Sequence, residues 1–430
     1  MKSKVQKPKN GRRKFLKGVA GVSAFAAGSQ IIGAPMVWAN KLKDIKLSHV
    51  GGAYSAMKPI AEQASKDLGF TIEMQNLGFE ALTARVATQP KTIDIADLSF
   101  VSMPAVTPRG VMQGIDISRI KNWDKITPIF TQGKNQDGST ASTQGNAPYE
   151  MMYLEKMDSK AWHEGPTEHA SLIPTIYNAD TLGIRPDIIA RPIENWSELF
   201  NPEFKGKAGI VDTPAVGIMD AAMALESRGD LIYGDKGNMT IEEIDKTMDV
   251  LIDLKKQGHF RSLWNTFDAS VNLMVAGEVV IQSMWSPAVT AVRSRGVDCT
   301  FVALKEGYRG WGNGIGMMAH LDGLQRDAAY EYINWYLDGW QGAFIARQGY
   351  YSAVPETTKA ALSQEEWDYW YEGKKATVDI KGPNGNLQEK AGHVRDGGSY
   401  WDRMGKVACW NAIHDENRHL TKRWNEFIAA

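Results

Sequence analysis

Between residues 45 and 98, segments with the hydrophobic period of a β-strand alternate with segments that have the hydrophobic period of a helix. A two-residue period, as in β-strands, occurs at 45–50, 70–74 and 93–98. Between these runs, 55–68 and 80–88 carry apolar residues at the three- and four-residue spacing of helices. This strand–helix rhythm predicts a parallel sheet covered by helices, and therefore an α/β fold.

The same alternation returns after residue 170, and a strand at 312–319 is predicted to cross back to the first group. Residues 131–170, rich in Gly, Asn, Gln, Ser and Thr, predict a long irregular excursion near a domain crossing. The remaining predictions are strands at 172–178, 208–211, 279–285 and 300–304, and helices at 218–225, 241–257, 287–295, 327–337 and 341–347.

The N-terminus has the pattern of an export signal. Residues 11–17 read Gly-Arg-Arg-Lys-Phe-Leu-Lys, the arrangement of a twin-arginine signal. A weakly apolar run follows at 19–32, and Val37-Trp38-Ala39 offers small residues for a signal peptidase. We therefore expect 1–39 to be a signal peptide, the twin-arginine export machinery to be a partner, and the mature protein to be periplasmic.

Removal of that segment changes the charge of the protein. The whole chain carries 49 basic and 50 acidic residues, and residues 1–39 hold six Lys, two Arg and no acid. The mature chain therefore has 41 basic and 50 acidic residues, a formal charge of −9. An acidic surface argues against nucleic acid as a partner and suits a protein that gathers small cations.

The sequence lacks the common motifs of catalytic, cofactor and metal sites. The mature chain has no G-x-S-x-G, C-x-x-C or H-E-x-x-H, so we expect no catalytic set, no cofactor and no metal. Cys299 and Cys409 could form a disulfide in an oxidising compartment or remain two buried thiols, and the sequence leaves both open. Two domains are expected, because about 390 residues exceed one core.

Three stretches, in this order, resemble the periplasmic spermidine/putrescine-binding proteins, a group within the type II solute-binding proteins of ABC importers. The first contains a tryptophan, a Glu-Leu pair and a terminal Lys-Gly-Lys. The second contains Gly-Glu-Val and a tryptophan at the end of a predicted strand. The third contains Glu-Gly, a tryptophan, a predicted helix and Gly-Tyr. They are residues 195–207, 276–286 and 305–355.

The resemblance implies two α/β lobes, each a central sheet flanked by helices, joined by crossing strands, with a ligand cleft between them. Its expected boundaries are 40–174 with 312–350 for lobe I, and 175–311 for lobe II. Residues 351–430 form an aromatic-rich tail that is expected to pack on the lobes; the part from Ser363 lies largely beyond the resemblance.

The resemblance also implies an aromatic cage for an amine. Trp285, Trp311 and Tyr350 match the cage positions, and cation–π contact with each ring is worth roughly 0.5–2 kcal/mol. Tyr54 and Ser99 match further cleft positions. For each ring, the alternative to a role in ligand binding is ordinary packing in the protein interior.

One departure concerns charge. Polyamine binders hold the terminal ammonium with an acid two residues after the crossing-strand tryptophan, and Asn313 stands there instead; a second family acid falls near Val216. We therefore expect the cleft to lack charge-neutralising partners, with Asp212, Glu80 and Asp268 as the remaining candidate acids. Burial of an unpaired ammonium costs several kcal/mol, so a ligand with one cationic end, a quaternary amine or a zwitterion fits better than a long polyamine.

The expected function is that of a monomeric, non-enzymatic binding protein that delivers a small organic amine or zwitterion to ABC permease subunits. A periplasmic cofactor-containing enzyme is one alternative. A ferric-ion-binding protein is another, because adjacent tyrosines at 350 and 351 resemble the iron ligands of ferric-binding relatives. A third alternative is a sensor that presents its bound ligand to a receptor.

Overall fold

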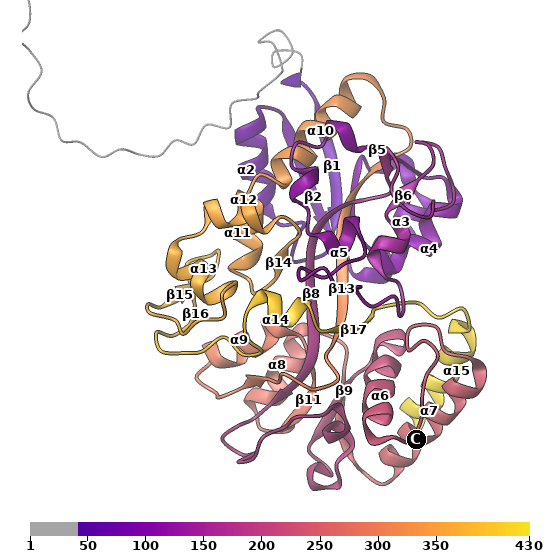
Figure 1. Ribbon diagram of the computed structural model, residues 1–430, viewed down its shortest axis with the longest axis vertical. Coiled ribbons are helices and arrows are strands. Elements are labelled where there is room, and N and C mark those ends of the chain that lie inside the picture. The colour runs from indigo at the N-terminus through magenta and orange to yellow at the C-terminus, as the bar shows by residue number, and fades with distance from the viewer. Residues whose placement is uncertain (1–41) are drawn as a thin grey trace, which may run out of the picture.

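The computed structural model describes residues 42–430, so the predicted signal at 1–39 lies outside the described part of the chain. Two α/β lobes lie one above the other, and two long strands run through both of them (Figure 1). One sheet path connects the whole molecule in the order β10-β9-β11-β8-β13-β3-β1-β2. The predicted two-lobed α/β fold is confirmed.

The first lobe is built on the predicted strand–helix alternation. Its parallel strands pair β2-β1-β3, with Lys46 opposite Thr71 and His49 opposite Ile95. Helix α2 ends at Gly69, whose φ of 75° lies in the left-handed region that glycine adopts most easily. The elements are β1 (Lys46–Gly51), α2 (Lys58–Leu68), β2 (Thr71–Asn76), α3 (Phe79–Thr88), β3 (Ile95–Ser99), α10 (Gly323–Tyr336) and α11 (Trp340–Ala346).

The excursion after β3 is largely irregular, as its composition predicts. Short strands inside it pair in the order β5-β7-β6, and β4 joins β13 at the edge of the main sheet. Its elements are α4 (Met103–Val106), β4 (Met112–Gln113), β5 (Ile115–Asp116), α5 (Pro128–Thr131), β6 (Tyr153–Leu154) and β7 (His169–Ala170).

Two strands, β8 (Ile173–Ile184) and β13 (Tyr308–Met318), cross between the lobes as an antiparallel pair. Both are longer than their sequence patterns predict, and every residue of β8 is buried. Glycine at alternate positions of β13 lets other elements pack closely on one face of the strand. At Gly312, for example, a Cβ would lie only 3.0 Å from the Phe130 ring. These two strands connect the lobes and fix the register between them.

The second lobe repeats the α/β arrangement with the strand order β10-β9-β11-β8. The segment Trp196–Phe200 forms a 3-10 helix whose tryptophan is fully buried. The elements are β9 (Ala208–Val211), α6 (Pro214–Arg228), α7 (Ile241–Lys256), β10 (Phe260–Trp264), α8 (Phe267–Val275), β11 (Ile281–Met284), α9 (Ser286–Ser294) and β12 (Thr300–Phe301).

The C-terminal tail contacts both halves of the molecule (Figure 1). Strand β17 pairs parallel with β13, the β15–β16 hairpin lies against α9, and α15 packs on α6 and α7. Its elements are β14 (Tyr351–Ser352), α12 (Pro355–Ala361), α13 (Gln364–Trp370), β15 (Ile380–Lys381), β16 (Leu387–Glu389), α14 (Tyr400–Met404), β17 (Val407–Trp410) and α15 (Asn417–Ala429).

The hydrophobic interior divides into two clusters that do not follow the chain order. The first joins the core of the first lobe to α8, α9 and the tail as far as Trp410. The second fills the rest of the second lobe and includes Trp424 of α15. Cys299 belongs to the first cluster and Cys409 to the second, and both are buried and free. None of the helices within residues 42–430 combines the length and apolar character that a bilayer crossing requires.

Candidate functional site: an aromatic cleft between the lobes

Three of the predicted cleft aromatics lie together where the lobes meet. The ring centroids of Tyr54 and Trp311 are 5.7 Å apart, those of Tyr54 and Tyr350 are 5.2 Å apart, and those of Trp311 and Tyr350 are 5.8 Å apart. Each ring is partly exposed. We call these three residues the ring triad. Rings at these distances are in direct contact with one another, and their exposed parts can face a cation.

The triad draws its members from three distant segments. Tyr54 follows the end of β1, Trp311 lies on β13, and Tyr350 directly precedes β14. Gln348 ties two of these segments together, because its Nε2 donates to the Tyr54 carbonyl at 3.2 Å. The pairing of Trp311 with Asn178 across β13 and β8 fixes the face of the strands to which the tryptophan belongs.

Polar groups form the floor of the triad. The Nδ2 of Asn313, which is 2 % exposed, donates to the Tyr54 hydroxyl at 2.6 Å and to Asp97 Oδ1 at 3.2 Å. Ser99 is adjacent, because its hydroxyl donates to the Gly312 carbonyl at 3.3 Å. Asn313 Oδ1 and Asp97 Oδ2 are both buried and find no donor within residues 42–430. Two acceptors are therefore available to a donor that enters beneath the rings.

Two buried acids correct the expectation that the site lacks carboxylates. Asp97 lies on β3 beneath the triad, and burial raises its pKa to about 6. Asp180 lies on β8 opposite Arg309; burial raises its pKa, while the Arg309 guanidinium opposes that shift.

Arg309 does not cancel the negative charge at the site. Its Nε donates to Asp220 Oδ1 at 2.7 Å, and its Nη1 lies 3.5 Å from Asp180 Oδ2. One guanidinium thus serves two buried carboxylates, and Asp97 has no cationic partner within the described residues. Burial raises the pKa of all three carboxylates, so the surroundings of the triad become negative as the pH rises through those values, and they then favour a cation.

The sequence candidates for that acidic role lie elsewhere. Asp212 accepts a hydrogen bond from the Trp424 indole at 2.8 Å and is thereby engaged by the tail. Glu80 and Asp268 are exposed at the first turns of α3 and α8. The sequence pattern missed Asp97 and Asp180 because their position at the site depends on strand pairing between distant segments.

Trp285, the remaining cage candidate, belongs to a second aromatic group. Its ring meets Trp264 edge-on at 4.8 Å between centroids and stacks on Phe267 at 6.4 Å. These residues come from the second lobe, whereas Tyr54 comes from the first. The structure therefore does not place Trp285 in the ring triad.

A cavity of about 390 Å³ lies between the two aromatic groups. Tyr350 of the triad is on its wall, and so is Phe267, on which Trp285 stacks. Both lobes and the tail contribute to it. The lining residues are Met57, Pro59, Phe267, Pro287, Ala291, Ser294, Phe344, Gln348, Tyr350, Pro383, Asn384, Asn386, Leu387 and Gln388. Cavities of this size hold small molecules.

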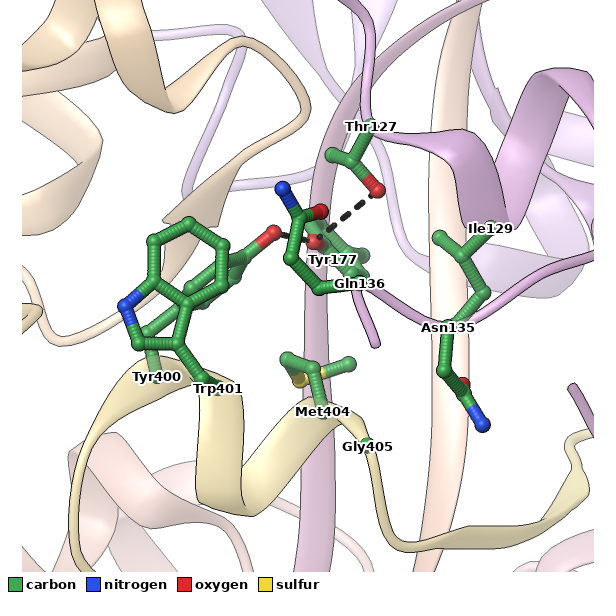
Figure 2. Close-up of a pocket in the computed structure, with 9 residues that line it drawn as sticks. All are labelled: Thr127, Ile129, Asn135, Gln136, Tyr177, Tyr400, Trp401, Met404 and Gly405. Atoms are coloured by element: carbon green, nitrogen blue, oxygen red, sulfur yellow. Dashed lines mark hydrogen bonds between the residues drawn. The ribbon is translucent and has the colours of Figure 1, made fainter. Parts of the chain in front are cut away.

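The opposite face of the crossing strands is occupied by the tail (Figure 2). Tyr177 of β8 is hydrogen-bonded to Tyr400 of α14 and donates to Thr127 at 3.5 Å, so a tail residue joins a lobe I loop across the strands. The pocket there measures about 20 Å³, roughly the space of one water molecule. This face is a brace between lobes and tail and has no room for an organic solute.

The adjacent tyrosines expected in a ferric site point to different places. Tyr350 lies in the triad, whereas Tyr351 packs with Tyr371 and Tyr400 at centroid distances of 5.4 and 4.9 Å. Their hydroxyls therefore do not share one site. No group of three or more His, Cys, Asp or Glu that could hold a metal occurs in the part of the chain that the structure describes.

Comparison with known proteins identifies the class. The profile of the bacterial extracellular solute-binding proteins matches residues 59–371, and the chain belongs to this family. The resemblance drawn from the three sequence stretches is thereby confirmed, and the family is defined by solute binding rather than by catalysis. Among curated protein sequences, none matches significantly.

Solved structures share the fold at low sequence identity. A spermidine/putrescine ABC transporter substrate-binding protein from Streptococcus pneumoniae has a TM-score of 0.61 and 14 % identity, covering 89 % of this chain and 98 % of its own. A GABA receptor has a TM-score of 0.55 and 17 % identity, covering 89 % and 97 %. The binding protein MotA of A. tumefaciens B6, in complex with glucopine, has a TM-score of 0.51 and 15 % identity, covering 75 % and 88 %.

Proposed function

We propose that this protein is the periplasmic solute-binding component of an ABC importer and that it captures a small organic amine beneath the ring triad. The carrying observation is the pair of buried acceptors, Asn313 Oδ1 and Asp97 Oδ2, that find no donor within residues 42–430. An ammonium group placed there would donate to both acceptors while its carbon chain contacts the rings of Tyr54, Trp311 and Tyr350.

This arrangement ranks the ligand classes. A primary or secondary ammonium carries the N–H groups that the two acceptors require, whereas a quaternary amine carries none. The negative surroundings formed by Asp97 and by the Asp180–Arg309–Asp220 group favour a cationic end. A zwitterion fits if its acidic end lies away from these carboxylates. We therefore expect primary amines to bind more tightly than their trimethylated counterparts.

Calorimetry with n-butylamine, putrescine, γ-aminobutyrate and n-butyltrimethylammonium tests this proposal. We expect at least one primary amine to bind at least tenfold more tightly than n-butyltrimethylammonium. Trp311→Ala should weaken that amine at least tenfold, which corresponds to about 1.4 kcal/mol. Trp401→Ala is the matched control, because this half-buried tryptophan lies by the pocket on the opposite face of the strands. Absence of binding by every compound at millimolar concentration would refute the amine proposal.

Export by the twin-arginine route belongs to the same proposal. Residues 1–39 carry the Arg12-Arg13 pair and a cleavage sequence ending at Ala39. Replacement of both arginines by lysine should leave the protein in the cytoplasm, whereas replacement of Lys2 and Lys4 by glutamine should not. Fractionation of cells that express each variant measures this. Periplasmic recovery of the double lysine variant would contradict the assigned route.

A further inference from the structure

The β15–β16 hairpin of the tail forms one wall of the interlobe cavity. Its turn contributes Asn384 and Asn386 and its strand β16 contributes Gln388, while β16 rests against α9 of the second lobe. The opposite wall includes Tyr350 of the ring triad. The hairpin lies beyond residue 371, where the match to the family model ends.

The lining of the cavity carries no charge and combines a mostly apolar wall with a group of carboxamides. None of its residues is acidic or basic, and four of them are carboxamides: Gln348, Asn384, Asn386 and Gln388. A carboxamide both donates and accepts hydrogen bonds, which matches hydroxyl and amide groups. A charged group placed here would have no counter-charge, and a plain hydrocarbon chain would cover polar atoms without replacing their hydrogen bonds. The cavity thus suits a neutral group whose hydrocarbon part lies on the apolar wall and whose hydroxyl or amide reaches the carboxamides.

Two of these carboxamides are free to act on a ligand. The side chains of Asn386 and Gln388 make no hydrogen bond to any other residue from 42 to 430, whereas Asn384 Oδ1 accepts from the Asn386 backbone amide at 3.1 Å and shapes the turn. Gln348 is engaged with the Tyr54 carbonyl and links the cavity to the triad. The cavity and the triad therefore form one continuous surface with two chemistries, acidic at one end and neutral at the other.

We propose that the hairpin creates a second subsite, which binds a neutral hydroxyl- or amide-bearing substituent of the solute whose amine lies under the ring triad. This inference rests on the proposed function. It assigns Asn386 and Gln388 as residues that determine specificity, and it predicts a solute larger than a simple alkylamine. The substituent would extend from Tyr350 toward the hairpin turn.

Calorimetry with three probes tests the subsite: n-butylamine, 1-amino-1-deoxy-D-glucitol and 4-aminobutanamide. We expect the hydroxylated probe, the amide probe or both to bind at least tenfold more tightly than n-butylamine. Asn386→Ala with Gln388→Ala should remove that advantage and leave n-butylamine unchanged within twofold. Gln325→Ala is the control, because Gln325 is exposed on α10 and does not line the cavity.

The outcomes separate the two proposals. Equal affinity for all three probes would overturn the subsite and leave the amine site intact. If the hairpin variant loses as much affinity for n-butylamine as for the larger probes, the subsite is also overturned. The hairpin would then support the fold of the amine site and would not bind a substituent. Absence of binding by all three probes would refute both proposals. Far-ultraviolet circular dichroism of the variant confirms that the chain is folded in each case.

Discussion

The amide nitrogen of Asn313 lies 3.2 Å from the carboxylate of Asp97, at the position where polyamine binders carry an acid. A carboxylate is present on the neighbouring strand β3 instead, and the amide holds it by donating a hydrogen bond. The same nitrogen donates to Tyr54 at 2.6 Å. One side chain thus orients both a ring and a carboxylate of the proposed amine site.

Restoration of the family acid with Asn313→Asp should destabilise the protein at alkaline pH. Two carboxylates in contact resist simultaneous ionisation, so one of them acquires a raised pKa. A raised pKa in the folded state gives a stability contribution that is complete at low pH and is lost as the pH rises through that pKa. Urea unfolding should show a loss of about 1–3 kcal/mol at pH 8 and a smaller loss at pH 5. Equal losses at both pH values would contradict the pairing.

Amine binding should depend on the ionisation of Asp97. Burial raises its pKa to about 6, so the carboxyl is neutral below that pH and negative above it. Affinity for n-butylamine should rise between pH 5 and pH 7.5, by up to tenfold for each pH unit below 6. Asp97→Asn should bind weakly at all pH values and show a flat profile by calorimetry. A rising profile in the variant would assign the titration to another group.

Asp97→Asn has its own stability test, in which the same linkage between pKa and stability predicts a gain for the variant relative to the wild type. Because the folded-state pKa lies above the ordinary value of 3.8, the wild type loses stability as the pH rises from about 4 to 6. The variant has no such loss, so its free energy of unfolding relative to the wild type should increase over that range, by roughly 1–3 kcal/mol. A constant difference from pH 4 to pH 7 would show that the carboxyl is not perturbed.

The fold could be predicted further from sequence than the site. The apolar periods placed β1, β2, β3, α2 and α3 within a few residues, because each of these elements buries one face in a regular pattern. The crossing strands were predicted too short. Their extensions at Thr181 and Tyr308 are stabilised by pairing with β11 and β17, and such long-range contacts leave no local signal.

The candidate site could likewise be predicted only where local motifs mark its residues. Tyr54, Trp311, Asn313 and Tyr350 were found through motifs and meet in space, and Ser99 is adjacent to them. Trp285 was expected beside them but lies in the aromatic group of the second lobe. The acids were missed, because Asp97 and Asp180 have no motif of their own and act only through strand register. The part of the tail after residue 371 has no family pattern from which its place could be inferred.

The two cysteines provide a test of the interior. Both are free and buried in different hydrophobic clusters, and burial raises the pKa of each thiol to about 12. A native protein prepared without reductant should therefore react slowly with a thiol reagent at pH 8. The same sample in denaturant should release two thiol equivalents. A release of none would show that Cys299 and Cys409 are joined by a disulfide in the folded protein.

Gly217→Ala tests how the tail docks on the second lobe. Gly217 lies near the N-terminus of α6, and within a helix alanine is favoured over glycine by about 1 kcal/mol on propensity alone. A Cβ at Gly217, however, would lie 2.3 Å from the Trp424 ring and 2.6 Å from the Val211 carbonyl. The carbonyl belongs to β9 and cannot move freely, so overpacking by about 1–3 kcal/mol should exceed the helical gain. We expect a lower urea midpoint in Gly217→Ala and no loss in the control Gly234→Ala, where a Cβ meets nothing within 4 Å. A midpoint equal to or above that of the wild type would mean that α15 does not pack against α6 through Trp424 in solution.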